Sequence, residues 1–342
     1  TLHNTLFPYT TLFRSPSLMA PQESPEVQSG AGWDRILSSS AEPQIVRALR
    51  EYIRRARWFG GKGRKIREIR IADSLTIPVA PRSIYVLLVE INYANAPTEQ
   101  YVLPVGFATG DLQIEIIEEF PNHVIARARV KDEEGILYEG IADDAFRQAL
   151  LETIARGRSK KLGRGTLVGR RGARFGALLG DRPSSLASRV LKAEQSNTSI
   201  VYDDTFFLKL YRRVEEGVNP DVELSRLLTE QTAFQNLPGF AGAIEWRRRD
   251  AGPMTMAMLL EMVPNEGDAW TYTLNNVDRS FAHALTLAEK LETLPEIPPS
   301  VLDVEPDAIP ELVLDFIGSV YLEMISILGQ RTGELHQAML SL

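Results

Sequence analysis

One lysine stands inside an otherwise apolar, strand-like segment, TFFLKLYRR, at residues 205–213. Alternation along a strand places Lys209 on one face and its neighbours Leu208 and Leu210 on the other. A lysine in such a place is either simply solvated or binds an anion, and a strand lysine is a recurring part of proteins that transfer phosphoryl groups. The hypothesis from this segment is that Lys209 contacts the phosphates of ATP.

A glutamate follows at the start of the next predicted helix. Asn219-Pro220 is a typical helix start, with Asn as the N-cap and Pro at the first helical position. Glu223 then lies in the first turn, where the helix dipole alone favours a carboxylate. The alternative hypothesis is that Glu223 pairs with Lys209 and holds its ammonium group. Glu230, two turns further on, is the competing partner.

The order of the predicted strands and helices indicates the fold in which Lys209 and Glu223 lie. From residue 186 the patterns predict three strands, a helix, two strands, a polar connection and then helices to the end of the chain. The last two of the three strands are joined by Asp203-Asp204, a hairpin signal, and the helix after Asn219 is predicted to end at Pro238-Gly239. This order predicts an α+β fold containing the antiparallel small lobe of a protein-kinase-like structure.

A polar segment, Gln195-Ser196-Asn197-Thr198-Ser199, is predicted to be the loop between the first two of these strands. Kinase folds carry their phosphate-covering loop at this place. The segment contains no glycine, so it is not the G-x-G-x-x-G type, but its hydroxyl and amide groups can donate hydrogen bonds to phosphate oxygens. An ordinary polar turn is the alternative interpretation.

The last strand before the polar connection ends in Glu261-Met262-Val263. In a kinase-like fold the backbone at this hinge meets the edge of the adenine ring. We therefore expect these three residues to contact the nucleotide, with the backbone N–H of Val263 as the donor.

The region before the small lobe is predicted to be rich in strands. A helix at 43–57 precedes several antiparallel strands, including one at 110–120, GDLQIEIIEEF, and a helix at 142–156 closes the region. The predicted buried side of the first helix consists of four apolar residues at helical spacing. These are Ile45, Leu49, Tyr52 and Ile53.

Two further segments are predicted to lie outside the folded regions. Residues 1–18 are interpreted as extraneous, since their apolar residues follow no period and Met19 is a more natural first residue; a transit or signal segment is the alternative. Residues 20–32, APQESPEVQSGAG, are polar and rich in Pro, Ser and Gly, which predicts disorder, so 1–40 is interpreted as a disordered or extraneous segment. Residues 156–185 are dense in Gly and Arg, which indicates either a basic, flexible connector or a surface that attracts phosphate.

The domain organisation follows from these patterns. It is a disordered or extraneous segment (1–40), a β-rich N-terminal cap (41–155), a basic connector (156–185), an ATP-binding small lobe (186–264) and the start of a helical large lobe (265–342).

Composition narrows the function classes. The 342 residues are 44% hydrophobic and 24% charged, which is typical of a globular protein. The absence of cysteine excludes disulfides, thiolate metal sites and cysteine nucleophiles. A net charge of −7 gives no reason to expect a nucleic-acid partner, and no apolar run approaches the ~18 residues of a membrane-spanning helix. We expect a cytoplasmic protein.

Several motifs resemble the maltokinases, including the maltokinase module fused to trehalose synthase. In chain order they are Arg57–Lys62, which is similar to the opening of that family's N-terminal cap domain, Glu194–Ser199, Lys209–Arg213, Glu216–Pro220 and Val263–Trp270. The resemblance implies an aminoglycoside-phosphotransferase-like kinase that uses ATP and Mg²⁺ to phosphorylate the reducing-end hydroxyl of maltose. The product, maltose 1-phosphate, serves α-glucan (glycogen) synthesis and trehalose metabolism. By this resemblance, ATP is contacted by residues 195–199, Lys209 and residues 261–263.

The sequence also departs from that family. The maltokinases have a catalytic His-Gly-Asp motif and a later metal-binding motif of the Asp-Phe-Glu type. Neither motif occurs in this sequence. We therefore expect no catalytic or metal-ligating residue in this chain, an incomplete large lobe and an exposed apolar surface on helix 311–342. The Mg²⁺ ligands and the maltose site are expected in a full-length parent enzyme, either stand-alone or fused to a trehalose synthase. A non-catalytic, kinase-like binding or regulatory module is the alternative function.

Overall fold

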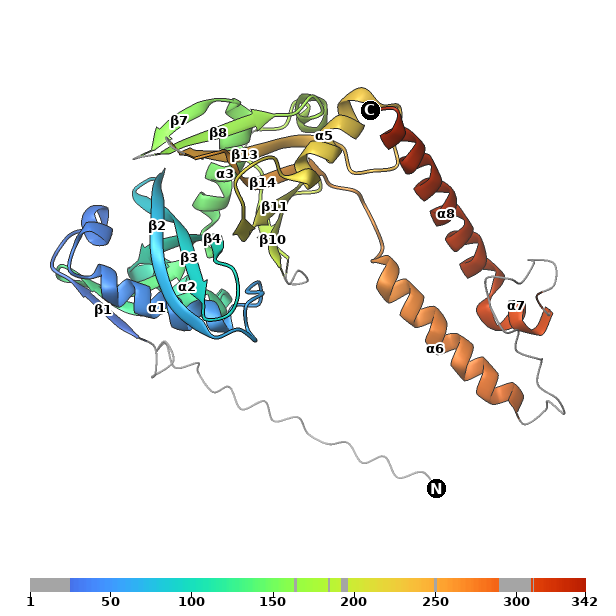
Figure 1. Cartoon of the computed structure of the whole chain (residues 1–342), viewed down its shortest axis with the longest axis horizontal. Helices are drawn as coiled ribbons and strands as arrows, with labels where there is room; N and C mark the ends of the chain where they lie inside the picture. Colours follow the sequence, from blue (N-terminus) through green and yellow to red (C-terminus); the bar gives the residue numbers. More distant parts are fainter. Residues whose placement is uncertain are drawn as a thin grey trace, which may run out of the picture. The chain divides into compact units, whose positions relative to one another are not determined.

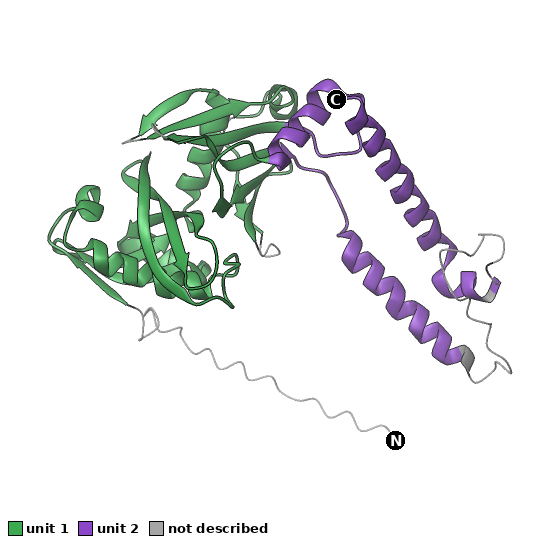
Figure 2. Cartoon of the chain, in the orientation of Figure 1, with its two compact units in different colours: residues 1–219, 241–259 green, residues 220–240, 260–342 purple. Residues whose placement is uncertain are grey.

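The computed structural model describes residues 25–162, 165–183, 185–191, 196–248, 251–288, 309 and 311–342. Over these residues the chain is a mixed α+β protein with two seven-stranded sheets (Figure 1). Its contacts divide it into two units, residues 1–219 with 241–259 and residues 220–240 with 260–342 (Figure 2). Each helix of the described part is too short or too polar to cross a membrane.

The first sheet confirms the predicted β-rich N-terminal region. Its strands are β1 (Glu26–Ser29), β2 (Ile66–Val79), β3 (Arg82–Tyr93), β4 (Glu99–Ala108), β5 (Val124–Val130), β6 (Glu133–Glu139) and β12 (Arg213–Val214). They lie in the order β1-β5-β6-β4-β3-β2, and β12 pairs with β4. The inner strand β3 is rich in β-branched and aromatic residues, and every residue from Ile84 to Val89 is buried.

Helix α1 (Glu42–Arg55) belongs to the core of this sheet. The four residues predicted to form its buried side are all buried, which confirms the helical period read from the sequence. They are Ile45, Leu49, Tyr52 and Ile53.

The second sheet contains the strands predicted for the small lobe. Its members are β7 (Ser159–Leu162), β8 (Gly165–Arg171), β9 (Ser188–Val190), β10 (Asn197–Tyr202), β11 (Phe206–Tyr211), β13 (Phe240–Arg248) and β14 (Met254–Glu261). They lie in the order β7-β8-β13-β14-β11-β10-β9, and β10 runs antiparallel to both of its neighbours. The hairpin predicted at Asp203-Asp204 joins β10 to β11, with Asp203 at a positive φ of 45°.

The described part of residues 1–40 is ordered, contrary to the expected disorder. Strand β1 pairs in parallel with β5, and Val27 on β1 has no exposed surface. A short 3-10 helix, η1 (Trp33–Ser38), follows and buries Ile36. Few apolar side chains enter the core here, so the polar composition of the segment concealed its structure.

The strand predicted at residues 110–120 is wrong, because this segment forms helix α2 (Gly110–Glu119). Leu112, Ile114 and Ile116 alternate with polar residues, which is the period of a strand. Only Ile116 of these is buried, and Ile114 is exposed. The glutamates between them favour a helix, and they stay in solvent there.

The expected connector at residues 156–185 contains β7, β8 and the short helix α4 (Phe175–Leu179). Strand β8 pairs antiparallel with β13, so this segment is part of the second sheet. A β-carbon added at Gly169 of β8 would lie 1.8 Å from the carbonyl oxygen of Thr153 in helix α3 (Asp144–Arg156). Glycine here lets a helix lie close against a strand, and it does not indicate a flexible linker.

The second unit contains four helices within the described residues. They are α5 (Pro220–Gln231), α6 (Ala269–Ala288), α7 (Glu311–Ile317) and α8 (Ser319–Leu340). Helix α5 ends at Gln231, seven residues before the predicted stop at Pro238. Gly318, with a φ of 86°, separates α7 from α8, because a left-handed backbone ends a helix.

Helix α8 exposes apolar side chains, as expected from the sequence. Val320, Ile325 and Leu328 are 66%, 44% and 56% exposed, respectively. Trp270 and Leu285 of α6 are also exposed. Exposed apolar side chains therefore lie on both long helices of the second unit.

Replacing Gly169 by Ala should lower the free energy of unfolding by about 2–3 kcal/mol, because the new methyl group would overlap the Thr153 carbonyl oxygen. Urea denaturation measures the change. Gly30→Ala is the control, since a β-carbon at Gly30 meets no atom within 4 Å. Its expected effect is within about 0.5 kcal/mol. Equal unfolding midpoints for the two variants would contradict the close-packing role of Gly169.

Candidate functional site

The candidate site lies on the β10–β11 hairpin of the second sheet. Lys209 of β11 is half-buried, and its ammonium nitrogen lies 5.3 Å from the centre of the Tyr211 ring, two residues along on the same face. Leu208 and Leu210 are buried on the opposite face. The alternation predicted for this strand is therefore confirmed.

Ser199 on β10 lies directly opposite Lys209 in the antiparallel register. Residues paired in this way project from the same face of a sheet. Ser199 is fully buried, and within the described part of the chain its hydroxyl has no hydrogen-bond partner. A buried hydroxyl without a partner is costly in a folded protein. The face that carries Lys209 thus also carries a donor that a ligand could satisfy.

The predicted polar loop is shorter than expected. Gln195 lies outside the described residues, and Ser196 is exposed just before β10. The remaining three residues, Asn197, Thr198 and Ser199, are the first residues of β10 and not part of a loop. The β-branched and aromatic residues that follow them favour a strand, which extends to the polar positions.

Thr198 faces the other side of the sheet from Lys209. It is paired with Leu210 in the register, and it is buried. Its Oγ1 accepts a hydrogen bond of 2.8 Å from Nε of Arg212. The Thr198 hydroxyl is therefore engaged inside the protein, and Ser199 is the hydroxyl on the Lys209 face.

Arg212 follows β11 and links the two sheets. Its guanidinium forms an ion pair with Glu139 at the end of β6, and both residues are 1% exposed. It also lies over the Trp58 ring, 5.0 Å from the ring centre. The carbonyl oxygen of Arg212 accepts a 2.7 Å hydrogen bond from the backbone of Val102 in β4. The chain therefore passes from the second sheet into the first at this residue, and Arg213 begins β12.

Glu139 is ionised at neutral pH. Burial is the largest single effect and would raise the pKa of Glu139, but the charges of Arg212 and His123 and the hydrogen bonds donated by Tyr52 and Arg212 together outweigh it. The pKa of Glu139 therefore lies below its usual value. Burial beside this carboxylate raises the pKa of Tyr52 well above its usual value, so Tyr52 stays a neutral donor.

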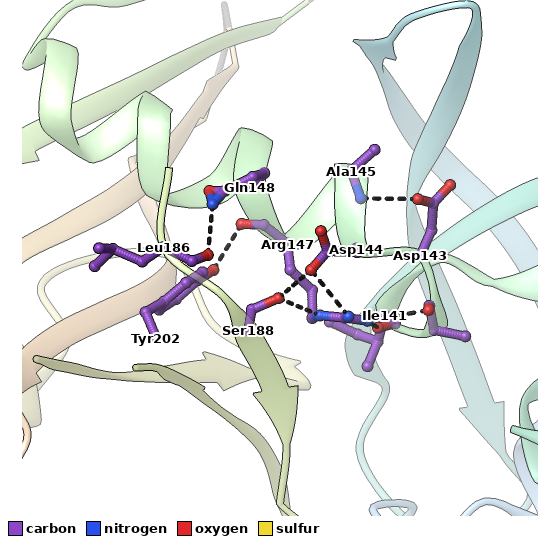
Figure 3. Close-up of polar contacts among 10 residues, drawn as sticks. Ile141, Asp143, Asp144, Ala145, Arg147, Gln148, Leu186, Ser188 and Tyr202 are labelled. Atoms are coloured by element: carbon purple, nitrogen blue, oxygen red, sulfur yellow. Dashed lines mark hydrogen bonds and ion pairs between the residues drawn. The ribbon is translucent and has the colours of Figure 1, made fainter. Parts of the chain in front are cut away.

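A second buried arginine, Arg147 of α3, contacts strand β9 and the end of strand β10 (Figure 3). Its Nε donates to Oγ of Ser188 in β9 at 2.7 Å, and its Nη1 donates to the carbonyl oxygens of Ile141 and Ala142 at 2.7 and 3.0 Å. The backbone carbonyl of Arg147 accepts a 2.6 Å hydrogen bond from the hydroxyl of Tyr202 at the end of β10. Helix α3 therefore fixes the end of β10 that is farthest from Thr198.

The predicted hinge residues belong to the second unit. Glu261 ends β14, and its backbone N–H donates to the carbonyl oxygen of Gly239 at 2.8 Å. Met262 and Val263 follow the strand, and Val263 is exposed. The carbonyl oxygen of Val263 accepts a hydrogen bond of 3.0 Å from the Asn265 side chain. The Glu261 N–H is engaged within the protein, and the donor role of the Val263 N–H stays a prediction.

Glu223 lies in the first turn of α5, as predicted, and is exposed. It belongs to the second unit, whereas Lys209 belongs to the first. The pairing of these two residues stays a prediction. Among the described residues, no three His, Asp or Glu side chains come together in a group that could hold a metal ion. No magnesium ligand is therefore assigned.

Sequence patterns did not identify Arg212, Glu139 or Arg147 as parts of this region. Arg212 and Arg213 are adjacent in the sequence, yet the first is 1% exposed and the second is exposed. Strand alternation predicts that neighbours face opposite sides, which was the available signal. It could not show which arginine would be buried, since each of the two pairs with a buried glutamate, Arg212 with Glu139 and Arg213 with Glu99.

The comparison with protein families concerns the first sheet. Residues 52–143 match the maltokinase N-terminal cap domain. The match includes the Arg57–Lys62 motif, and it ends at Asp143, whose side chain caps helix α3. The resemblance to the maltokinases predicted from the sequence is confirmed over this cap domain.

Solved structures similar to this chain include glucosamine kinases. One, in complex with glucosamine, ADP and inorganic phosphate, is 14% identical at a TM-score of 0.37, over 70% of this chain and 46% of that chain. A second crystal form has 14% identity and a TM-score of 0.36, over 71% of this chain and 47% of the other. The chain thus spans less than half of these structures. The similarity is too low to support a conclusion about this chain.

Replacing Glu139 by Gln should lower the free energy of unfolding at pH 7 by about 3–5 kcal/mol, because Arg212 would remain as a buried charge without its partner. The lowered pKa of Glu139 gives a contribution that is complete above about pH 4.5 and is lost as the pH falls through that lowered pKa. The Glu139→Gln variant should not show this loss of stability as the pH falls, because glutamine does not titrate. Urea denaturation from pH 7 to about pH 3 measures both effects.

Glu134→Gln is the matched control, since Glu134 forms an exposed ion pair with Arg129. Its expected cost is under about 1 kcal/mol. If the two variants lost the same stability at pH 7, the central role of the buried pair would be contradicted.

Proposed function

We propose that this chain supplies the ATP-binding part of a maltokinase-type sugar kinase, with the nucleotide phosphates on the Lys209 face of the β10–β11 hairpin. The observation that carries the proposal is the unpartnered, buried hydroxyl of Ser199 directly opposite Lys209 in the described structure. The maltokinase cap domain in the same chain supports this choice of kinase class.

The proposed roles follow from the chemistry of each group. The Lys209 ammonium neutralises phosphate charge, and the Ser199 hydroxyl donates a hydrogen bond to a phosphate oxygen. Ser196 and Asn197, at the start of β10, add polar donors beside them. These groups fit a phosphate chain, because they combine a cation with neutral donors on one strand pair.

The remaining predicted residues are proposed to hold the rest of the nucleotide and the lysine. The backbone N–H of Val263 donates to the adenine edge, and Glu261 and Met262 form the hinge beside it. Glu223 pairs with Lys209 and orients the ammonium group, as the recurring kinase arrangement requires.

The acceptor is proposed to be the reducing-end hydroxyl of maltose, an alcohol group, which gives maltose 1-phosphate in α-glucan and trehalose metabolism. The role proposed for the residues of this chain is nucleotide binding, and phosphoryl transfer to maltose is proposed for the full-length parent. No step is assigned to Mg²⁺, because the described residues provide no group of metal ligands. A kinase assay of the full-length parent with maltose, glucose and an aminoglycoside tests the acceptor.

A non-catalytic, kinase-like binding module is the second candidate function, since binding on the Lys209 face of the hairpin does not by itself require phosphoryl transfer. Both candidates share the nucleotide site. The parent's kinase assay separates them, since a binding module phosphorylates none of the three acceptors. The kinase module of a trehalose synthase fusion would phosphorylate maltose.

Replacing Lys209 by Ala should weaken binding of a fluorescent ATP analogue to this chain by about 10- to 100-fold, because one charge-assisted hydrogen bond is lost. The melting temperature should stay close to that of the wild type, since Lys209 is only half-buried. Lys160→Ala, at an exposed position on β7, is the control and should bind normally. The absence of saturable binding by the wild-type chain would overturn the proposed function.

A double-mutant cycle tests the partner of Lys209. Glu223→Gln and Lys209→Ala should be non-additive in nucleotide affinity, with a coupling of about 1–2 kcal/mol, because each removes the same ion pair. Glu230→Gln is the comparison, since Glu230 already forms an ion pair with Arg226 on α5. Coupling of Lys209 to Glu230, and additivity with Glu223, would assign the role to the competitor.

A further inference from the structure

Strand β10 is held at both ends through the face that is turned away from Lys209. Near its start, Oγ1 of Thr198 accepts from Arg212, and at its end the hydroxyl of Tyr202 donates to the backbone of Arg147. Thr198 and Tyr202 are four residues apart, so they share one face of the strand. Ser199 lies between them on the other face.

Arg212, which binds Thr198 near the start of β10, is itself held in place by other residues. Arg212 is paired with Glu139 of β6, a strand that the maltokinase cap match includes. Its guanidinium also lies against the Trp58 ring, within the same matched residues. Because both members of the ion pair are 1% exposed, the guanidinium cannot move without separating a buried pair of charges. Arg212 therefore offers Thr198 a stationary donor.

We propose that Thr198 is a positioning residue for nucleotide binding: through its hydrogen bond to Arg212, the cap domain sets where Ser199 stands opposite Lys209. The inference rests on the proposed nucleotide site and adds the residue that connects this site to the cap. Its physical basis is that a bound group must meet its partners within a fraction of an ångström.

The geometry separates positioning from simple stability. The start of β10 adjoins exposed residues, since Ser196 is exposed and Asn197 is half-buried. Thr198 is thus the first buried residue of the strand, next to the exposed end. Loss of the Thr198 acceptor would also leave Nε of Arg212 without this partner, while Nη1 of Arg212 already has none among the described residues. This unpaired N–H costs stability, on the order of 1–3 kcal/mol. Affinity is therefore measured well below the melting temperature, where a less stable but folded variant binds normally unless the strand has moved.

Replacing Thr198 by Val, which keeps the shape and removes the acceptor, should weaken binding of a fluorescent ADP analogue by about 5- to 10-fold when affinity is measured well below the melting temperature. The melting temperature should fall modestly, because Nε of Arg212 loses its acceptor. Thr198→Ser retains the acceptor and should bind within about 2-fold of the wild type. Thr205→Val is the matched control, because Thr205 is buried on the β10–β11 turn and its hydroxyl accepts from Arg182. Its affinity should equal that of the wild type.

The outcomes separate the two proposals. If the wild-type chain does not bind the analogue, the proposed function fails. If the wild type binds, and Thr198→Val has the same affinity, the positioning role of Thr198 is overturned. A lower melting temperature with unchanged affinity likewise gives a structural role only and overturns it. Should the Val variant not fold, Thr198→Ala replaces it, with the same expected loss and the same contradicting result.

Discussion

The buried ion pair between Arg212 and Glu139 is the constraint on which the first unit depends. A guanidinium withdrawn from water is stable only beside a carboxylate with good geometry. This requirement brings the chain out of the second sheet at the end of β11 and into the first sheet as β12. Residues 52–143, which are similar to the maltokinase cap domain, and the hairpin with Lys209 are consequently parts of one folded unit.

Much of the fold was predictable from local patterns. The buried side of α1, the alternation of β11 and the turn at Asp203 each follow from short-range periodicity or turn chemistry, which the neighbouring residues determine. The same reasoning failed for α2, since alternating apolar residues fit a strand or one side of a helix. It also failed at Gly169, because the role of a glycine depends on what approaches it, and the Thr153 carbonyl is distant in sequence.

The candidate site was likewise predicted only in part from the sequence. Alternation predicted the face of Lys209, and the register then placed Ser199 beside it. The sequence could not assign Thr198 to the opposite face, because the point at which β10 begins depends on pairing with β11 and on the donor from Arg212. The hairpin thus has two functions on its two faces. One face is held by the cap, and the other is proposed to receive the nucleotide phosphates.

Labelling with an acyl-phosphate derivative of ATP tests the central claim most directly, because such a probe acylates the lysine amine that lies beside the bound phosphates. Peptide mapping of the labelled full chain should find the modification at Lys209, and excess ATP should prevent it. Modification confined to exposed lysines such as Lys62 and Lys160, without protection by ATP, would contradict a nucleotide site on this hairpin.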